Sequence, residues 1–249
     1  MGRFFGHNVK YIFYHFLTGA LDLFLWSGEL IGEENLPKEG PAVFIANHLG
    51  PSGPIAVVCS IPLQLYPWAV GDMVDKELAP EYLRLDFVEP RLKLKLPFSR
   101  SFSKFLSKIT VPMLRGLGCI PAYLGGQERL YETLEMSLSL LLEGKCLLVF
   151  PEYSDVGSDT FVKMYPFQKT VFRLGEMYYD QTGKRLAFYP VAVHESGKVM
   201  VGKAIAYNPL NALGKERHRL KDLLEETVKG MYLQMAGEGY VGTMFPEHE

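Results

Sequence analysis

The sequence predicts an α/β fold in which a mixed central sheet is flanked by helices. Short apolar runs of strand length alternate with longer segments of helical periodicity, and no internal repeat or low-complexity tract breaks the alternation. The 249 residues are enough for one large domain with a substantial core. We therefore predict an α/β domain over residues 33–249, preceded by an N-terminal amphipathic helical element over residues 1–32.

The N-terminal element contains the nearest candidate for a membrane span, residues 11–26. His15 and Asp22 interrupt it, so it falls short of the roughly 18 uninterrupted apolar residues that a spanning helix needs. We expect a helix that lies at a membrane interface, and a helix packed on the domain is the alternative. The aromatic residues that suit an interface are Phe4, Phe5, Tyr11, Phe13, Tyr14, Phe16, Phe24 and Trp26.

The first predicted strand of the domain covers Ala42–Ala46, an apolar run that ends at Asn47 and His48. Residues 49–54 contain two Gly, two Pro and one Ser, so the chain must turn there. The apolar segment 55–61 can begin a helix behind the second of these prolines. His48 is therefore predicted to lie at a strand-to-helix turn.

The second half of the chain continues the alternation of helices and strands. Leucines recur at helical spacing over residues 127–143, and Gly144 can end this helix. The further predicted elements are a strand over residues 146–150, a helix over 166–179, strands over 186–193 and 198–206, and a closing amphipathic helix over 213–235.

Charge, cysteine and histidine content argue against several classes of function. The net charge is −2 and the pI is near 6.3, so we predict no nucleic-acid partner. The three cysteines sit in apolar runs without the paired spacing of a zinc or redox site, which is typical of reduced core residues in a cytosolic protein. The six histidines are scattered along the chain, and we predict no metal site.

One segment, residues 84–108, is strongly basic, with seven Lys and Arg residues against two acidic residues. Leu and Phe residues interleave with the charges, a pattern typical of a segment pressed onto anionic lipid headgroups. A solvated loop or helix face is the alternative. The mean hydropathy of +0.04 and the hydrophobic fraction of 48% also favour apolar surface that faces a membrane or a partner. We therefore predict contact with a membrane surface.

Four short segments carry distinctive residues in a defined order: GPAVFIANH at residues 40–48, GCIPA at 118–122, VFPE at 149–152 with PFQK at 166–169, and YPVAV at 189–193. Together they resemble the motifs of the lysophospholipid and glycerol-phosphate acyltransferase family, and the resemblance spans roughly residues 36–206. It implies a glycerol-phosphate acyltransferase-like sheet flanked by helices.

The resemblance implies an O-acyltransferase of phospholipid biosynthesis, which moves a fatty acyl group from acyl-CoA or acyl carrier protein to a hydroxyl of a lipid or lysophospholipid-like acceptor. The acyl donor is a co-substrate, and no cofactor or metal is implied. A base must take the proton of the attacking hydroxyl, and a neutral His suits that task near pH 7. The family gives this role to the residue that matches His48. The implied substrate-binding residues are Asn47, Phe150, Pro151, Glu152, Tyr153 and Lys169.

Three positions depart from the family pattern. Gly53 stands where an Asp would orient the histidine, Leu124 where an Arg would bind an acceptor phosphate, and Tyr153 where a Gly would follow Glu152. The missing Asp leaves two functions open, a weak enzyme and a non-catalytic lipid-binding member of the same fold. A histidine that is only hydrogen-bonded in its loop is a further alternative.

Residues from elsewhere in the chain could replace the two lost side chains. A carboxylate could come from Asp72, Asp75, Glu152 or Asp155, and a phosphate-binding cation from Arg115, Arg129 or Arg173. Without such an arginine, we expect glycerol 3-phosphate to be a poor acceptor. A lipid acceptor would also place the protein at the cytoplasmic face of a membrane, as a peripheral or monotopic protein.

Overall fold

The computed structural model describes residues 14, 18–19, 28–50, 52–123, 127–152 and 164–237. Most of the predicted N-terminal element therefore lies outside the described residues. Tyr14 is helical and only 1% exposed, and its hydroxyl accepts a hydrogen bond from the N–H of Leu65 at 3.1 Å. At this residue the structure matches the alternative of a helix packed on the domain. Among the residues that the structure describes, no helix is both long and apolar enough to span a membrane.

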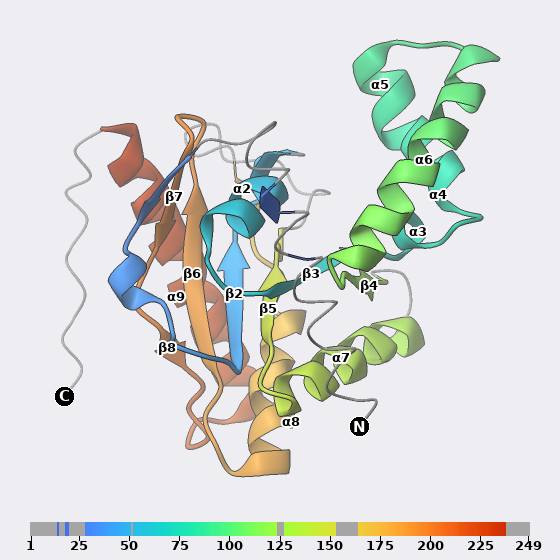
Figure 1. Ribbon diagram of the computed structural model, residues 1–249. Helices are drawn as coiled ribbons and strands as arrows, with labels where there is room; N and C mark the ends of the chain where they lie inside the picture. The colour runs from blue at the N-terminus through green and yellow to red at the C-terminus, as the bar shows by residue number, and fades with distance from the viewer. Residues whose placement is uncertain are drawn as a thin grey trace, which may run out of the picture.

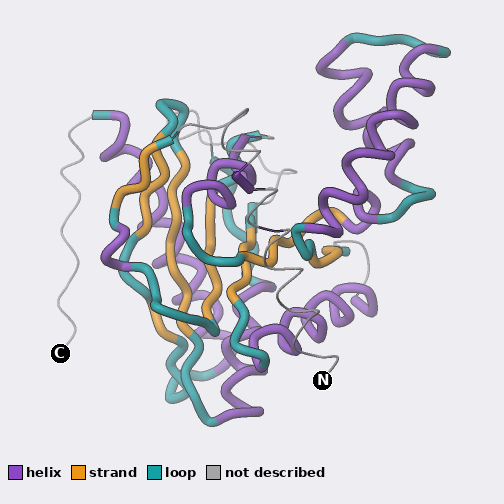
Figure 2. The backbone as a smooth tube through the Cα atoms, viewed as in Figure 1, coloured by secondary structure: helices purple, strands orange, loops and turns teal. Residues whose placement is uncertain are grey.

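The described strands form one mixed sheet with the order β1-β7-β6-β2-β5-β3-β4, and β8 pairs with β6 (Figures 1 and 2). The β6–β7 and β6–β8 pairs are antiparallel, and the other pairs are parallel. The strands are β1 (Glu29–Ile31), β2 (Ala42–Ala46), β3 (Leu65–Val70), β4 (Ile120–Ala122), β5 (Cys146–Val149), β6 (Ala187–Val193), β7 (Lys198–Val201) and β8 (Ile205–Ala206).

Strand β2 lies at the centre of the sheet, between β5 and β6, and its bounds are those predicted from the sequence. All five of its residues are fully buried, since both faces of the sheet are covered here. Val43 and Ile45 pack in one core cluster, whereas Ala42, Phe44 and Ala46 pack in a second cluster on the other face. Burial on both faces explains why β2 is an uninterrupted apolar run.

Helices cover both faces of this sheet. The cluster that contains Phe44 includes residues of α2, whereas the cluster that contains Val43 includes residues of α7, α8 and α9. The helices are η1 (Glu33–Asn35), α2 (Ser52–Ser60), α3 (Gly71–Val74), α4 (Ala79–Leu83), η2 (Arg84–Val88), α5 (Glu89–Leu92), α6 (Phe98–Gly116), α7 (Gln127–Leu142), η3 (Thr170–Phe172), α8 (Arg173–Thr182) and α9 (Leu213–Ala236). The predicted class, a mixed sheet flanked by helices, is confirmed.

Residues 71–116 form a helical arm between β3 and β4, which consists of α3, α4, η2, α5 and α6. The arm projects from the sheet on the side toward which the arrowhead of β2 points (Figure 1). The predicted basic segment, residues 84–108, lies entirely within it. The sequence predicted the charge of this segment but not its helices.

Three predicted boundaries are wrong. Strand β1 lies within the predicted N-terminal element, but it pairs with β7 and so belongs to the sheet. The helix predicted from residue 166 begins only at Thr170, because Phe167 instead bridges to Glu152 beside β5. The strand predicted over residues 198–206 is interrupted at Gly202, where an added Cβ would lie 2.9 Å from Pro190 and Met231 atoms.

Candidate active site

The candidate site lies at the carboxyl ends of three neighbouring parallel strands. His48 follows β2, Glu152 follows β5, and His194 follows β6. In open α/β sheets this edge is where ligands bind. The sheet therefore brings together residues that are more than 100 positions apart in the sequence, such as His48 and Glu152.

Asn47 fastens the end of β2 to the end of β6. Its side-chain Nδ2 donates to the carbonyl of Val193 at 3.0 Å, and its Oδ1 accepts from the N–H of Val193 at 2.7 Å. The side chain is 1% exposed. This geometry gives Asn47 a positioning role for the next residue, His48, and its predicted contact with substrate stays a prediction.

Glu152 fixes the backbone of the turn that follows β2 and contains His48, which we call the histidine turn. Its Oε1 accepts a hydrogen bond from the N–H of His48 at 2.7 Å, and its Oε2 accepts from the N–H of Tyr165 at 3.4 Å. Burial raises the pKa of Glu152 to about 7, although both N–H donors favour the ionised carboxylate. The carboxylate thus bonds to the backbone of His48 and not to its ring.

The His48 ring stands edge-on to the ring of Phe150, with centroids 5.2 Å apart and an interplanar angle of 79°. Desolvation by the surrounding protein lowers the pKa of His48 below its ordinary value of 6.5, although the residue itself is exposed. Its own backbone acts in the opposite direction. A neutral imidazole keeps one ring nitrogen with a free lone pair, as a general base requires.

Gly53 lies in the first turn of α2, and its N–H donates to the carbonyl of Leu49 at 3.2 Å. Its φ is not among the positive values of the chain. An added Cβ would lie 3.5 Å from the carbonyl oxygen of Asn47 and from the carbonyl carbon of His48, which is ordinary van der Waals contact. The turn therefore has space for the first carbon of an Asp side chain.

One carboxylate of the arm favours the charged form of His48. Asp86 of η2 opposes the lowering of the His48 pKa, but its effect is smaller than that of desolvation. Of the replacements considered from the sequence, Asp75 accepts from the N–H groups of Glu77 and Leu78 at 2.7 and 3.1 Å, and Asp155 lies outside the described residues. Sequence reasoning missed Asp86, because it is embedded in the basic segment and 38 positions from His48.

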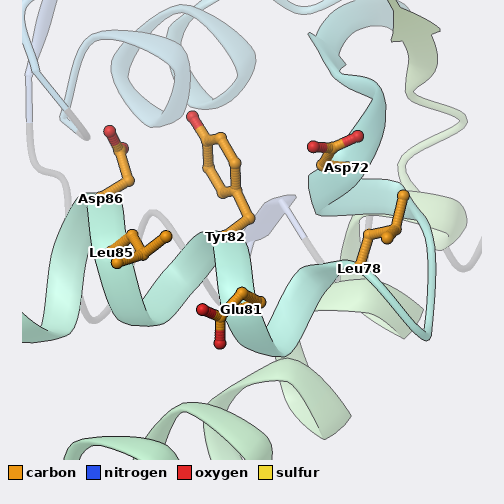
Figure 3. Close-up of a pocket in the computed structure, with 6 residues that line it drawn as sticks. All are labelled: Asp72, Leu78, Glu81, Tyr82, Leu85 and Asp86. Carbon is orange, nitrogen blue, oxygen red and sulfur yellow. The ribbon is translucent and has the colours of Figure 1, made fainter.

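Asp86 lines a pocket of about 330 Å³ on the arm (Figure 3). Tyr82 and Asp86 project from the same side of the helix, one turn apart, and Asp72 lies across from them (Figure 3). Burial and the neighbouring carboxylate of Asp86 raise the pKa of Tyr82 to about 12. The residues that line the pocket are Asp72, Leu78, Glu81, Tyr82, Leu85 and Asp86.

The arginine that acts on the histidine turn is Arg91 of α5. A Cβ added at Gly50 would lie 3.8 and 4.0 Å from its two terminal nitrogens, and its positive charge lowers the pKa of His48. The three arginines considered from the sequence are engaged elsewhere. Arg115 donates to the carbonyl of Val74 at 3.0 Å, Arg129 lies 4.8 Å from the ring centroid of Tyr123, and Arg173 lies 4.7 Å from that of Tyr131.

The other predicted site residues differ in burial, and two positions singled out from the sequence are not described. Pro151 is buried, and its carbonyl accepts from the N–H of Gln168 at 2.6 Å, so the PFQK segment is held against the end of β5. The side chain of Lys169 is exposed at the start of η3. Tyr153 and Leu124 lie outside the described residues. Within the described ranges, no group of three or more His, Cys, Asp or Glu side chains could hold a metal ion.

Comparisons with known proteins support the fold. No family model matches the sequence, and no curated protein matches it. The chain is similar to the crystal structure of the 1-acyl-sn-glycerophosphate (LPA) acyltransferase PlsC from Thermotoga maritima, with a TM-score of 0.56 and 15% sequence identity. The similarity covers 96% of this chain and 82% of that chain. The protein thus shares with this acyltransferase a mixed α/β fold whose central sheet is flanked by helices.

Proposed function

We propose that the protein is an O-acyltransferase, which moves a fatty acyl group from acyl-CoA or acyl carrier protein to a hydroxyl of a lipid acceptor. The observation that carries the proposal is the geometry of His48. Its ring has a lowered pKa and stands at the carboxyl end of the central strand, and its backbone is fixed by Glu152. The fold shared with a known acyltransferase gives this site its chemical context.

In the proposed reaction, the unprotonated ring nitrogen of His48 accepts the proton of the acceptor hydroxyl as its oxygen attacks the thioester carbonyl carbon. The C–S bond then breaks, and the leaving thiolate takes the proton back from the imidazolium. The lowered pKa favours this role, since such a His is neutral at pH 7. The ester product and the free thiol balance the reaction without a cofactor.

We expect slow turnover, because Gly53 stands where an Asp would orient the histidine. A carboxylate beside the ring would orient the imidazole and stabilise its charged form. Here Asp86 of the arm supplies a negative charge that favours the charged form of His48. We therefore expect measurable activity rather than none.

Thiol release from acyl-CoA in the presence of amphiphilic alcohols tests the proposal. The parent protein should release thiol above the background rate, and His48→Ala should reduce the release to background. His218→Ala is the matched control, because His218 is exposed on α9, where its ring bonds to the carbonyl of Gly214 at 2.7 Å. Equal release by the parent and His48→Ala would contradict the catalytic assignment.

A non-catalytic lipid-binding protein is the second candidate function. The observation that favours it is that, among the described residues, no carboxylate accepts a hydrogen bond from the His48 ring. A protein of this kind would bind a fluorescent fatty acid and release no thiol from any acyl donor. This combination of results would replace the enzyme proposal.

A lipid acceptor resides in a bilayer, so we propose that the protein acts at the cytoplasmic face of a membrane, within phospholipid biosynthesis. Peripheral or monotopic attachment would suffice for this role. Glycerol 3-phosphate, which is water-soluble, should be a poorer acceptor than an amphiphilic alcohol. Comparable rates with both acceptors would contradict that ranking.

A further inference from the structure

Helix α6 exposes its apolar face. Phe98, Phe102, Phe105 and Ile109 recur at spacings of three and four residues, so they lie on one side of the helix. They are 75%, 38%, 60% and 54% exposed, respectively. We call these four residues the Phe stripe. Large apolar side chains grouped in this way on a surface mark an interaction site.

The opposite face of α6 is buried, and it consists mainly of serines. Ser99, Ser103 and Ser107 are at most 6% exposed. The hydroxyl of Ser99 donates to Oε1 of Glu89 at 2.8 Å, and Ser103 and Ser107 donate to backbone carbonyls of α6 itself. A helix of a soluble domain normally buries its apolar side and exposes its polar side. Helix α6 does the reverse, so packing within the arm does not account for its phenylalanines.

Exposed basic side chains lie in the same segment as the Phe stripe, although Arg100 and Lys104 are on the other side of α6, in a pocket that Glu77 and Glu81 also line. None of the ion pairs among the described residues includes these basic side chains, unlike Arg84, which pairs with Glu81 and Glu89. Residues 84–108 carry a net charge of +5 in a chain whose net charge is −2, so the positive charge is concentrated here. The exposed basic residues of the segment are Arg91, Lys93, Lys95, Arg100, Lys104 and Lys108.

We propose that the arm docks on an anionic lipid bilayer, with the Phe stripe inserted among the acyl chains and Lys93, Lys95 and Lys108 at the headgroups. An exposed apolar helix face with Lys side chains beside it has the chemistry of an interfacial helix. The net positive charge of residues 84–108 matches an anionic surface, and no specific pairing is required. The stripe lies on a projecting helix, which suits a flat bilayer (Figure 1).

Docking would bring the proposed active site to its lipid acceptor, and this consequence rests on the proposed function. Arg91 belongs to the same basic segment and lies beside Gly50 in the histidine turn. A docked arm would therefore hold the His48 turn close to the lipid surface from which the acceptor comes. Vesicle binding requires no turnover, so docking and acyl transfer can fail independently. His48→Ala should bind vesicles as the parent does.

Flotation of the full chain with vesicles tests the docking surface. The parent should bind phosphatidylcholine vesicles that contain phosphatidylserine more tightly than vesicles of phosphatidylcholine alone. A triple change of Phe98, Phe102 and Phe105 to Ser should weaken binding by about tenfold or more, because exposed apolar side chains then have nothing to insert. A triple change of Lys93, Lys95 and Lys108 to Glu should reduce binding to the anionic vesicles to a similar extent.

Matched controls separate the arm from the rest of the surface. Leu142, Leu210 and Leu213 are 46%, 86% and 48% exposed, and their joint change to Ser should leave binding unchanged. The exposed Lys184, Lys203 and Lys215 serve as the charge control when changed to Glu. Absence of vesicle binding by the parent, or equal binding by the parent and the stripe variant, would overturn the proposal. A parent dimer that the stripe variant converts to a monomer, with vesicle binding unchanged, would assign the face to a second copy of the chain instead.

Discussion

Phe44 in the sheet and Phe98 on the arm are the same residue type in opposite environments. Phe44 is fully buried in β2, and its ring stacks on that of Tyr189 with centroids 5.2 Å apart. Phe98 is 75% exposed at the start of α6. Apolar burial stabilises the fold only where the side chain leaves water on folding. The sheet therefore uses its phenylalanine for stability, whereas the phenylalanine of the arm remains available for binding.

Polar groups show the same contrast. In the sheet, Asn47 is buried and satisfied by two hydrogen bonds to Val193. On the arm, the basic side chains of residues 84–108 other than Arg84 are exposed, and only Arg84 takes part in ion pairs among the described residues. The sheet thus fixes the position of the histidine, and the arm adds charges around it. Four experiments test this division.

The largest expected effect is on stability. Phe44→Ala should lower the free energy of unfolding by about 3–5 kcal/mol, since it leaves a cavity in a packed core. Phe98→Ala should change it by no more than about 0.5 kcal/mol, because the side chain is mostly in water. Urea unfolding followed by circular dichroism measures both variants. A loss for Phe98→Ala comparable to that for Phe44→Ala would mean that the stripe is part of the folding core.

The next effect concerns the partly buried carboxylate of Glu152. Its pKa rises from an ordinary 4.5 to about 7 on folding, so the folded state favours the protonated form. The contribution of this group to the free energy of unfolding is fully present below pH 4.5. As the pH rises to about 7, the free energy of unfolding should fall by an amount on the order of 1–3 kcal/mol. Glu152→Gln cannot ionise, and its stability should therefore vary less between pH 5 and 8. Parallel curves for the two proteins over this range would show that Glu152 titrates normally.

The sheet and the histidine turn were predictable from the sequence because their physical causes are local. An apolar run buried on both faces and a turn of Gly and Pro residues define β2 and the position of His48. The helix over residues 127–142 was likewise predictable from its leucine spacing, and Gly144, at φ +74°, ends it as expected. In each case the residues that determine the element lie next to one another in the chain.

The contacts of the site depend on residues far apart in the chain. Asn47 bonds to Val193, 146 positions away, and a residue type alone does not show whether such an amide faces substrate or backbone. Asp86 and Arg91 affect the charge of His48 only because the fold brings these arm residues near the turn after β2. The apolar face of α6 was missed for a different reason. Its spacing is that of any amphipathic helix, and the sequence does not show which face is buried.

Gly53→Asp tests whether the arm has taken over the role of the missing carboxylate. The backbone tolerates a Cβ here, so the variant should fold. We expect turnover to rise about tenfold, because a carboxylate close to the ring orients it and stabilises the imidazolium better than a distant one. Gly53→Ala is the matched control and should leave turnover near the parent value. If Asp86 already supplies this function fully, Gly53→Asp will gain activity only when Asp86→Asn is also present.

The smallest expected effect is the shift that the arm imposes on the pKa of the base. Desolvation already lowers the pKa of His48, so the acid limb of the pH profile of kcat/KM should lie below pH 6.5. Arg91→Met removes a positive charge that disfavours the imidazolium, and should move this limb to higher pH by a few tenths of a unit, about 0.5 kcal/mol or less. Asp86→Asn removes a negative charge that favours the imidazolium, and should move the limb to lower pH.

Lys184→Met is the control for the loss of an exposed positive charge, and should leave the limb in place. Opposite shifts for the two arm variants, reduced at high salt, would show that the arm acts on His48 through its charges. Shifts in the same direction would show that the variants act by displacing the arm.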